Sequence, residues 1–312
     1  MPAIVKRCVA RRDARLHATV VGERELFRRD TGGARLPLRG GSALAWFGGR
    51  LALVQDDADA VALVEPRDGR VTTVPVPRTA DDPPRFDFEA CVRFGSAAGP
   101  ETLLLLSSGS RKPPWRLAQL ADPLRPRVAV RAADGLYAML RAAGDFTGGV
   151  LNIEGALARG RGLRLFNRGG RGGFNASVDL PRQAFLPQSP GAGVMPGADR
   201  VTRYDLGMLD GIALGFTDVA AAPAGGTLFV AAAEDSAGAT VDGAVAGSVA
   251  GIIRRGHARW IEIRDAAGAL HGQKIEGLCL DPADPGRGWA VTDADDAGVP
   301  ARLYRLEFHG PW

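Results

Sequence analysis

A pattern that occurs five times along the chain limits its fold more than any other feature. Each copy begins with a polar or acidic residue, continues with a small residue and enters a short apolar run. The copies begin at Ser42, Glu89, Glu154, Asp218 and Glu276. Self-similarity at a spacing of several tens of residues is typical of repeat architectures, in which every copy is one unit of supersecondary structure.

The residues after each opening predict the shape of this unit. A second apolar run follows every opening and ends in a polar turn; these runs cover residues 51–54, 103–106, 163–166, 228–231 and 289–292. Alternating segments follow at 70–74, 126–130, 199–204 and 258–263. Continuous apolar runs indicate buried strands, whereas alternation indicates half-solvated outer strands. Four strands with this gradient form a propeller blade, so we predict an all-β fold, a β-propeller of four-stranded blades.

The spacing of the openings favours five blades, with six as the alternative. We treat residues 1–312 as a single propeller domain whose repeats open near 42, 89, 154, 218 and 276. The last repeat ends soon after residues 303–306, so a strand from residues 3–9 or 17–21 should complete it and cover two sheet edges. Two insertions interrupt the pattern, at 181–198 and 237–251, and the first is predicted to be a long surface loop.

Charge and cysteine content exclude several classes of protein. The net charge is +4, but acidic and basic residues alternate throughout, which argues against a nucleic-acid partner. The three cysteines show no paired spacing, so neither a disulfide framework nor a zinc site is predicted. No apolar stretch is long enough to span a bilayer, and no signal peptide is evident. We expect a monomer without a membrane partner, cytoplasmic unless a leader was removed, in which case periplasmic.

The acidic openings are the candidate metal ligands. Innermost strands of a propeller surround its axis, so Glu89, Glu154, Asp218 and Glu276 should converge there with Ser42. Close carboxylates require either raised pKa values or a cation, and calcium suits oxygen ligands. The alternative is a structural network in which these carboxylates accept hydrogen bonds from backbone amides of the next blade.

Basic residues in the polar turns are candidate substrate-binding groups. Together with Ser42, the side chains of Arg111, Lys112, Arg168 and Arg171 could hold a phosphorylated or other small-molecule ligand beside a carboxylate-bound cation. Equally, they could be solvated loop residues. No Gly-x-Ser-x-Gly motif is present, so a serine hydrolase mechanism has no local support.

Two of the openings carry a resemblance to known families. Asn152-Ile-Glu-Gly-Ala-Leu and Lys274-Ile-Glu-Gly-Leu-Cys, each followed by a strand and a polar turn, resemble blade openings of bacterial esterase-like phytase propellers. They are also similar to those of gluconolactonase- and paraoxonase-type propellers. The resemblance implies an axial calcium ion held by Glu154 and Glu276.

Two functions therefore remain open. One is a metal-dependent hydrolase of phosphoesters or lactones, with calcium as its cofactor, at the mouth of the channel. The other is a non-catalytic propeller that binds a ligand or a protein partner on one face. Fold alone does not decide between them.

Overall fold

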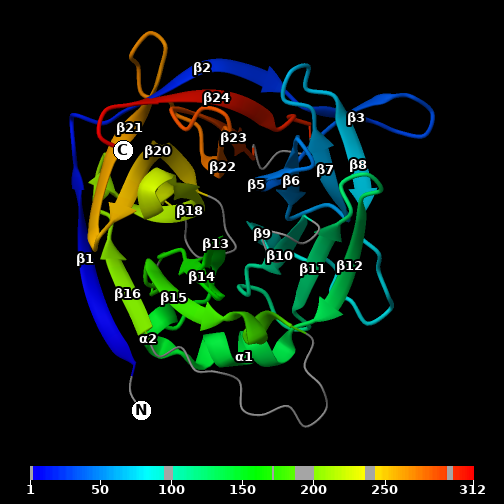
Figure 1. Cartoon of the computed structure of the whole chain (residues 1–312), viewed down its shortest axis with the longest axis horizontal. Coiled ribbons are helices and arrows are strands. Elements are labelled where there is room, and N and C mark those ends of the chain that lie inside the picture. Colours follow the sequence, from blue (N-terminus) through cyan, green and yellow to red (C-terminus); the bar gives the residue numbers. More distant parts are fainter. Residues whose placement is uncertain (1–2, 95–100, 171, 187–199, 236–242, 294–297) are drawn as a thin grey trace.

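The computed structural model describes residues 3–94, 101–170, 172–186, 200–235, 243–293 and 298–312. Its strands form four-stranded antiparallel sets arranged around a common axis (Figure 1). We call these sets blades 1 to 5, in the order of their innermost strands. The prediction of an all-β propeller is confirmed.

Blades 1 and 2 are separate sheets, each built from four consecutive strands. Blade 1 contains β5 (Gly41–Phe47), β6 (Arg50–Gln55), β7 (Ala60–Val64) and β8 (Val71–Pro75). Blade 2 contains β9 (Phe88–Arg93), β10 (Thr102–Ser107), β11 (Arg116–Ala121) and β12 (Arg127–Ala132). The second strand of each blade is buried along almost its whole length, as its continuous apolar sequence predicts.

Blades 3 and 4 have the same order of strands. Blade 3 contains β13 (Ile153–Arg159), β14 (Gly162–Asn167), β15 (Ala176–Pro181) and β16 (Arg200–Asp205). Blade 4 contains the longer strands β18 (Ile212–Ala222), β19 (Gly226–Asp235), β20 (Ala244–Arg254) and β21 (His257–Asp265). The short β17 (Met208–Leu209) pairs with the beginning of β18.

Blade 5 combines the two ends of the chain. Its inner strands are β22 (Ile275–Leu280), β23 (Arg287–Thr292) and β24 (Arg302–His309). The outer strand is β2 (His17–Glu25), which pairs antiparallel with β24 from His17 opposite His309 to Glu25 opposite Arg302. The predicted closure by an N-terminal strand is therefore confirmed, and the segment near 17–21 supplies it.

The other candidate segment, near residues 3–9, has a different place. Strand β1 (Ile4–Arg12) runs parallel to β16 in its first part and parallel to β21 in its last part. It thus covers the outer edges of blades 3 and 4 (Figure 1). An unpaired outer edge is a site of aggregation, and β1 removes two such edges.

The apolar core lies between the blades. Each inner strand contacts that of the next blade, and β22 contacts β5, so the ring is closed. Five apolar clusters fill the spaces between neighbouring blades. Their burial, at about 25 cal/mol per Å² of apolar surface, is the main stabilising contribution to the ring.

Three parts of the chain differ from the simple repeat. Helices α1 (Asp134–Ala142) and α2 (Gly144–Thr147), which the sequence pattern did not indicate, connect blade 2 to blade 3. The expected insertion at 237–251 is wrong in its second half, because β20 begins at Ala244. Within the expected loop at 181–198, Arg182–Phe185 form a 3₁₀ helix, η1, and residues 187–198 lie outside the described residues.

The remaining elements are short. A second 3₁₀ helix, η2 (Pro223–Gly225), connects β18 to β19. Strands β3 (Phe27–Arg29) and β4 (Arg35–Pro37) pair as a hairpin, which contacts β8 at the rim of blade 1. This hairpin projects beyond the ring in Figure 1.

Candidate functional site

A β-bulge in every innermost strand orients the side chains at the axis. In each blade one residue is passed over in the pairing between the first and second strands: Ser42, Glu89, Glu154, Thr217 and Glu276. A bulge bends its strand and redirects one side chain, so the five residues form a ring of equivalent positions. Four of the five predicted openings therefore occupy this ring.

In blade 4 the equivalent position belongs to Thr217, and Asp218 lies one residue further along. The Thr217 hydroxyl donates to the carbonyl of Ile275 at 2.6 Å. Asp218 is buried and accepts hydrogen bonds from the backbone amides of Val219 and Leu278, both at 2.7 Å. Burial raises the pKa of Asp218 well above its usual range, and these amides oppose the rise. Asp218 thus links blade 4 to blade 5 through backbone hydrogen bonds.

On one side of the axis, two cationic side chains lie between three carboxylates and pair with all of them. Arg168 contacts Glu154 at 3.4 Å and also pairs with Glu234. The ammonium of Lys274 lies 3.3 Å from Glu234 and 2.7 Å from Glu276. These five side chains come from blades 3, 4 and 5 and form one continuous ion network. We call them the paired half of the site.

The pKa values in the paired half follow from burial and from these contacts. Burial raises the pKa of Glu154 to about 7, although Arg168 opposes the rise. Glu234 is also buried, but Lys274 and Arg168 outweigh that effect and lower its pKa. A further hydrogen bond, from Asn152 to Glu154 at 2.7 Å, fixes the carboxylate.

On the other side of the axis, three carboxylates lie together with much less compensation. One oxygen each from Asp56, Asp87 and Glu89 can be chosen so that all three lie within 4.8 Å of one another. We call these residues the acidic triad. Arg111 donates to Asp87 at 2.6 Å, but its side chain is 44% exposed. No hydrogen bond or ion pair to Glu89 occurs within the described ranges.

Within the acidic triad, Asp56 shows most directly that compensating partners are missing from the described part of the chain. Its Oδ1 atom is buried and has no hydrogen-bond partner among the described residues, and its Oδ2 atom lies 3.9 Å from Arg85. Burial and the nearby carboxylates of Asp293 and Asp57 raise the pKa of Asp56 to about 7. Burial and the neighbouring carboxylates likewise raise that of Glu89. The acidic triad could hold a metal ion, because a bound cation would supply the missing partner.

The predicted substrate-binding residues lie in different environments. Arg111 is in the acidic triad's immediate surroundings, and Arg168 belongs to the paired half. Ser42 is buried, and its hydroxyl donates to the carbonyl of Gly40 at 3.3 Å. Lys112 is exposed, and Arg171 lies outside the described residues.

Asp56, Asp87, Glu234 and Lys274 were not among the predicted site residues. Asp87 and Lys274 each precede a bulge residue by two positions, as Asn152 does, so polar character at that position was a usable signal. Asp56 follows the end of β6, and Glu234 lies near the end of β19, both at positions where the sequence pattern predicted polar turns and singled out only basic residues as binding groups.

Comparison of the sequence with known families gives one match. Residues 37–308 match a family described as a family of unknown function (DUF6929). The chain belongs to this family. The matched region of the family begins before β5 and ends within β24, so it includes all five bulge residues and leaves out β1 and β2. No curated protein matches the sequence.

Solved structures with a similar fold include enzymes of different kinds. A glutaminyl cyclase from Myxococcus xanthus has 10% sequence identity and a TM-score of 0.50, and the match covers 100% of both chains. A β-1,3-galactosidase of glycoside hydrolase family 43 has 7% identity and a TM-score of 0.51, with 91% of this chain and 59% of that one covered. At such identities the likeness concerns the fold alone.

A lactonase-type structure matches less well. A candidate 6-phosphogluconolactonase from Bacteroides uniformis has 12% sequence identity and a TM-score of 0.33, with 78% of this chain and 62% of that chain covered. The specific likeness to phytases stays a prediction. Within the described residues, no helix is long and apolar enough to cross a membrane.

Proposed function

We propose that this protein is a hydrolase that requires a divalent cation, held by Asp56, Asp87 and Glu89, and acts on phosphoester or lactone substrates. The observation that carries the proposal is the acidic triad itself: three carboxylates within 4.8 Å, with one buried oxygen of Asp56 lacking a partner. Clustered like charges of this kind are expected at sites that bind cations or perform acid–base chemistry.

The ligand set favours a hard cation, and calcium is our choice. Carboxylate oxygens are typical ligands of calcium, whereas zinc usually recruits histidine or cysteine. Of the four ligands predicted from sequence, Glu89 remains in this proposal. Glu154 and Glu276 contact Arg168 and Lys274, and Asp218 accepts backbone hydrogen bonds, so a cation would have to compete with these partners.

The chain's own residues offer a route for proton transfer. When bound, a divalent cation polarises a phosphoryl or carbonyl oxygen and lowers the pKa of water. Glu154 has a pKa of about 7, which suits a residue that accepts and returns a proton near neutral pH. Asn152 and Arg168 hold its carboxylate in place. Arg111, half-exposed beside Asp87, could contact an anionic group of the substrate.

The paired half supports the second candidate, a propeller that binds a ligand or protein without catalysis. Its carboxylates are neutralised by side chains of the protein itself, as expected of a structural network. In that case the acidic triad would bind a cation for stability alone.

Two measurements on the native protein test the proposal together. Elemental analysis should find about one equivalent of a divalent metal. A panel of phosphomonoester, phosphodiester and lactone substrates, assayed with calcium, magnesium or manganese, should show turnover that Asp56→Asn and Glu89→Gln abolish. The matched control is Asp179→Asn, because Asp179 is a carboxylate on β15 that pairs with Arg164. Metal without turnover would favour the binding candidate, and absence of both would refute the cation site.

A further inference from the structure

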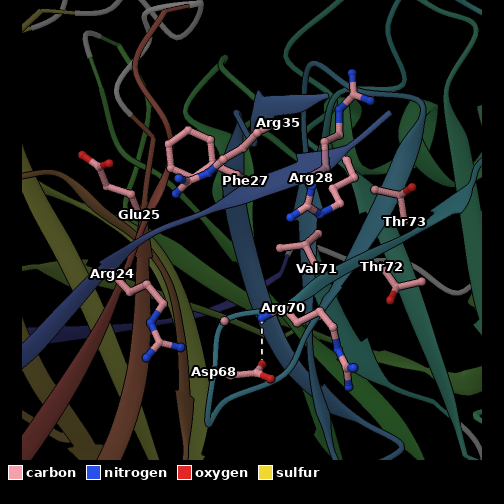
Figure 2. A pocket seen from close by; sticks show the side chains of 12 residues that line it. Arg24, Glu25, Phe27, Arg28, Arg35, Asp68, Arg70, Val71, Thr72 and Thr73 are labelled. Atoms are coloured by element: carbon pink, nitrogen blue, oxygen red, sulfur yellow. Dashed lines mark hydrogen bonds between the residues drawn. The ribbon is translucent and has the colours of Figure 1, made fainter. Parts of the chain in front are cut away.

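A basic groove lies at the rim of blade 1, away from the axis. It has a volume of about 660 Å³ and is formed by the end of β2, the β3–β4 hairpin, the turn before β8 and β8 itself. Five arginines and two carboxylates line it (Figure 2); the arginines are Arg24, Arg28, Arg29, Arg35 and Arg70. The groove therefore carries an excess of positive charge.

Arg70 lies 3.9 Å from Glu65, but the other four arginines form no ion pair with a carboxylate within the described residues. The side chain of Arg28 has neither a hydrogen bond nor an ion pair within the described part of the chain. Arg24 and Arg29 donate only to backbone carbonyls, of Arg67 at 3.3 Å and of Gly33 at 3.0 Å. Of the two carboxylates, Glu25 lies 3.5 Å from Arg302, which is not part of the lining.

One guanidinium is held in a fixed orientation. Arg35 lies over the ring of Phe27, 3.6 Å from its centroid, as Figure 2 shows. Stacking restricts the guanidinium and leaves its N–H edge free, and this planar edge matches the oxygens of a phosphate in a bidentate contact. On β8, the exposed side chains of Thr72 and Thr73 add hydroxyl donors to the same groove.

We propose that this groove is a binding site for a small soluble molecule with two or more phosphate groups. The guanidinium groups come from three separate segments, so a single phosphate could not contact all of them. The volume lies within the range of about 300–1,000 Å³ that is typical of small-molecule sites. Glu25 and Asp68 interrupt the positive surface, so an extended polyanion such as a nucleic acid would meet like charges.

The site is tested by calorimetric titration of the full chain with inorganic tripolyphosphate. Binding should be at least about tenfold tighter than that of orthophosphate and should weaken with salt. Arg28→Gln, which removes no side-chain hydrogen bond or ion pair among the described residues, should lower the affinity about tenfold, equivalent to about 1.4 kcal/mol. Arg35→Gln should have a similar effect and leave the melting temperature nearly unchanged.

A control variant and two control ligands distinguish a specific binding site from general electrostatic attraction. Arg7→Gln removes the same charge from an exposed position on β1 that does not line the groove. It should change the affinity less than about twofold. An equal loss in Arg7→Gln and Arg28→Gln would overturn the proposal. So would binding of a glutamate-rich peptide or a single-stranded oligonucleotide as tight as that of tripolyphosphate. This outcome is independent of the axial site, because no lining residue belongs to the acidic triad.

Discussion

The two halves of the axial site contain equal numbers of carboxylates but differ in what surrounds them. In the paired half, Glu154, Glu234 and Glu276 share two cations, Arg168 and Lys274. In the acidic triad, the nearest cation in contact is the half-exposed Arg111. Both halves lie at the same end of the blades, near the bulges or the second-strand turns.

The difference shows that bulges alone do not determine the chemistry of this axis. Equivalent backbone positions hold Glu89, which has no partner in the described ranges, and Glu276, which Lys274 contacts at 2.7 Å. Whether a carboxylate is stabilised depends on the residue two positions before each bulge, which is lysine in blade 5 and aspartate in blade 2. Blade 2 therefore concentrates negative charge where blade 5 balances it, and among the described residues the acidic triad is the cluster that could hold a metal ion.

Removal of a buried cation from the paired half should have the largest effect. Lys274→Met leaves Glu234 and Glu276 buried with less compensation, and we expect the free energy of unfolding to fall by about 3–5 kcal/mol. Chemical denaturation measures this change. If Lys274→Met were as stable as the parent, the paired half would not be a stabilising network.

Calcium should distinguish the acidic triad from other buried carboxylates. In EDTA, Asp56→Asn should be more stable than the parent, by about 1 kcal/mol, because it removes one of several crowded buried charges. Calcium at a hundred times its Kd should stabilise the parent by about 2.7 kcal/mol and leave Asp56→Asn unchanged.

Asp218→Asn provides the contrast for that experiment. This variant weakens hydrogen bonds from backbone amides and should lose about 1–3 kcal/mol equally with and without calcium. A calcium response that disappears in Asp218→Asn but persists in Asp56→Asn would reverse our assignment.

The dependence of stability on pH should reveal Glu154. Its pKa is about 7 in the folded protein, against about 4.3 for an unperturbed glutamate, so the folded state binds the proton more tightly. This contribution is complete below about pH 4 and is lost as the pH rises through about 7. In EDTA, the parent should lose stability between about pH 4 and pH 7 with a slope of at most about 1.4 kcal/mol per pH unit from this group. Glu154→Gln should have a flatter profile, and an identical profile would contradict the assignment.

The smallest effect is expected at the exposed edge of the triad. Arg111→Gln should change the free energy of unfolding by less than about 1 kcal/mol, since the arginine is half-exposed. It should nevertheless tighten calcium binding, because Asp87 loses a competing cation. Lys112→Gln, one residue further and exposed, should alter neither property.

The sequence pattern was sufficient for the strands and for most of the bulge ring, because both depend on local alternation and composition. It misplaced the blade 4 position by one residue. Thr217 and Asp218 are both polar, and only the pairing of β18 with β19 determines which of them is passed over. Register across a hairpin depends on tertiary packing, which a single sequence does not display.

The division of the site into two halves was harder to predict for a related reason. Glu234 contacts Arg168 because β19, the second strand of blade 4, is longer than the second strands of the other blades. This contact therefore depends on strand length and not on a sequence motif. Asp56 and Asp87 come from neighbouring blades and lie 31 positions apart in the sequence. Their proximity depends on how the blades are arranged around the ring.

The place of β2 in blade 5 has a consequence for how the protein is made. During synthesis β2 leaves the ribosome long before its partner β24, so the ring cannot close until residues 302–309 have emerged. Pairing over such a long sequence separation is slow, because the ends of a very long loop must first meet. Between the synthesis of β2 and that of β24 the ring is therefore only partly assembled and has open edges, and occupancy of ribosome-associated chaperones should fall only when residues 302–309 have emerged.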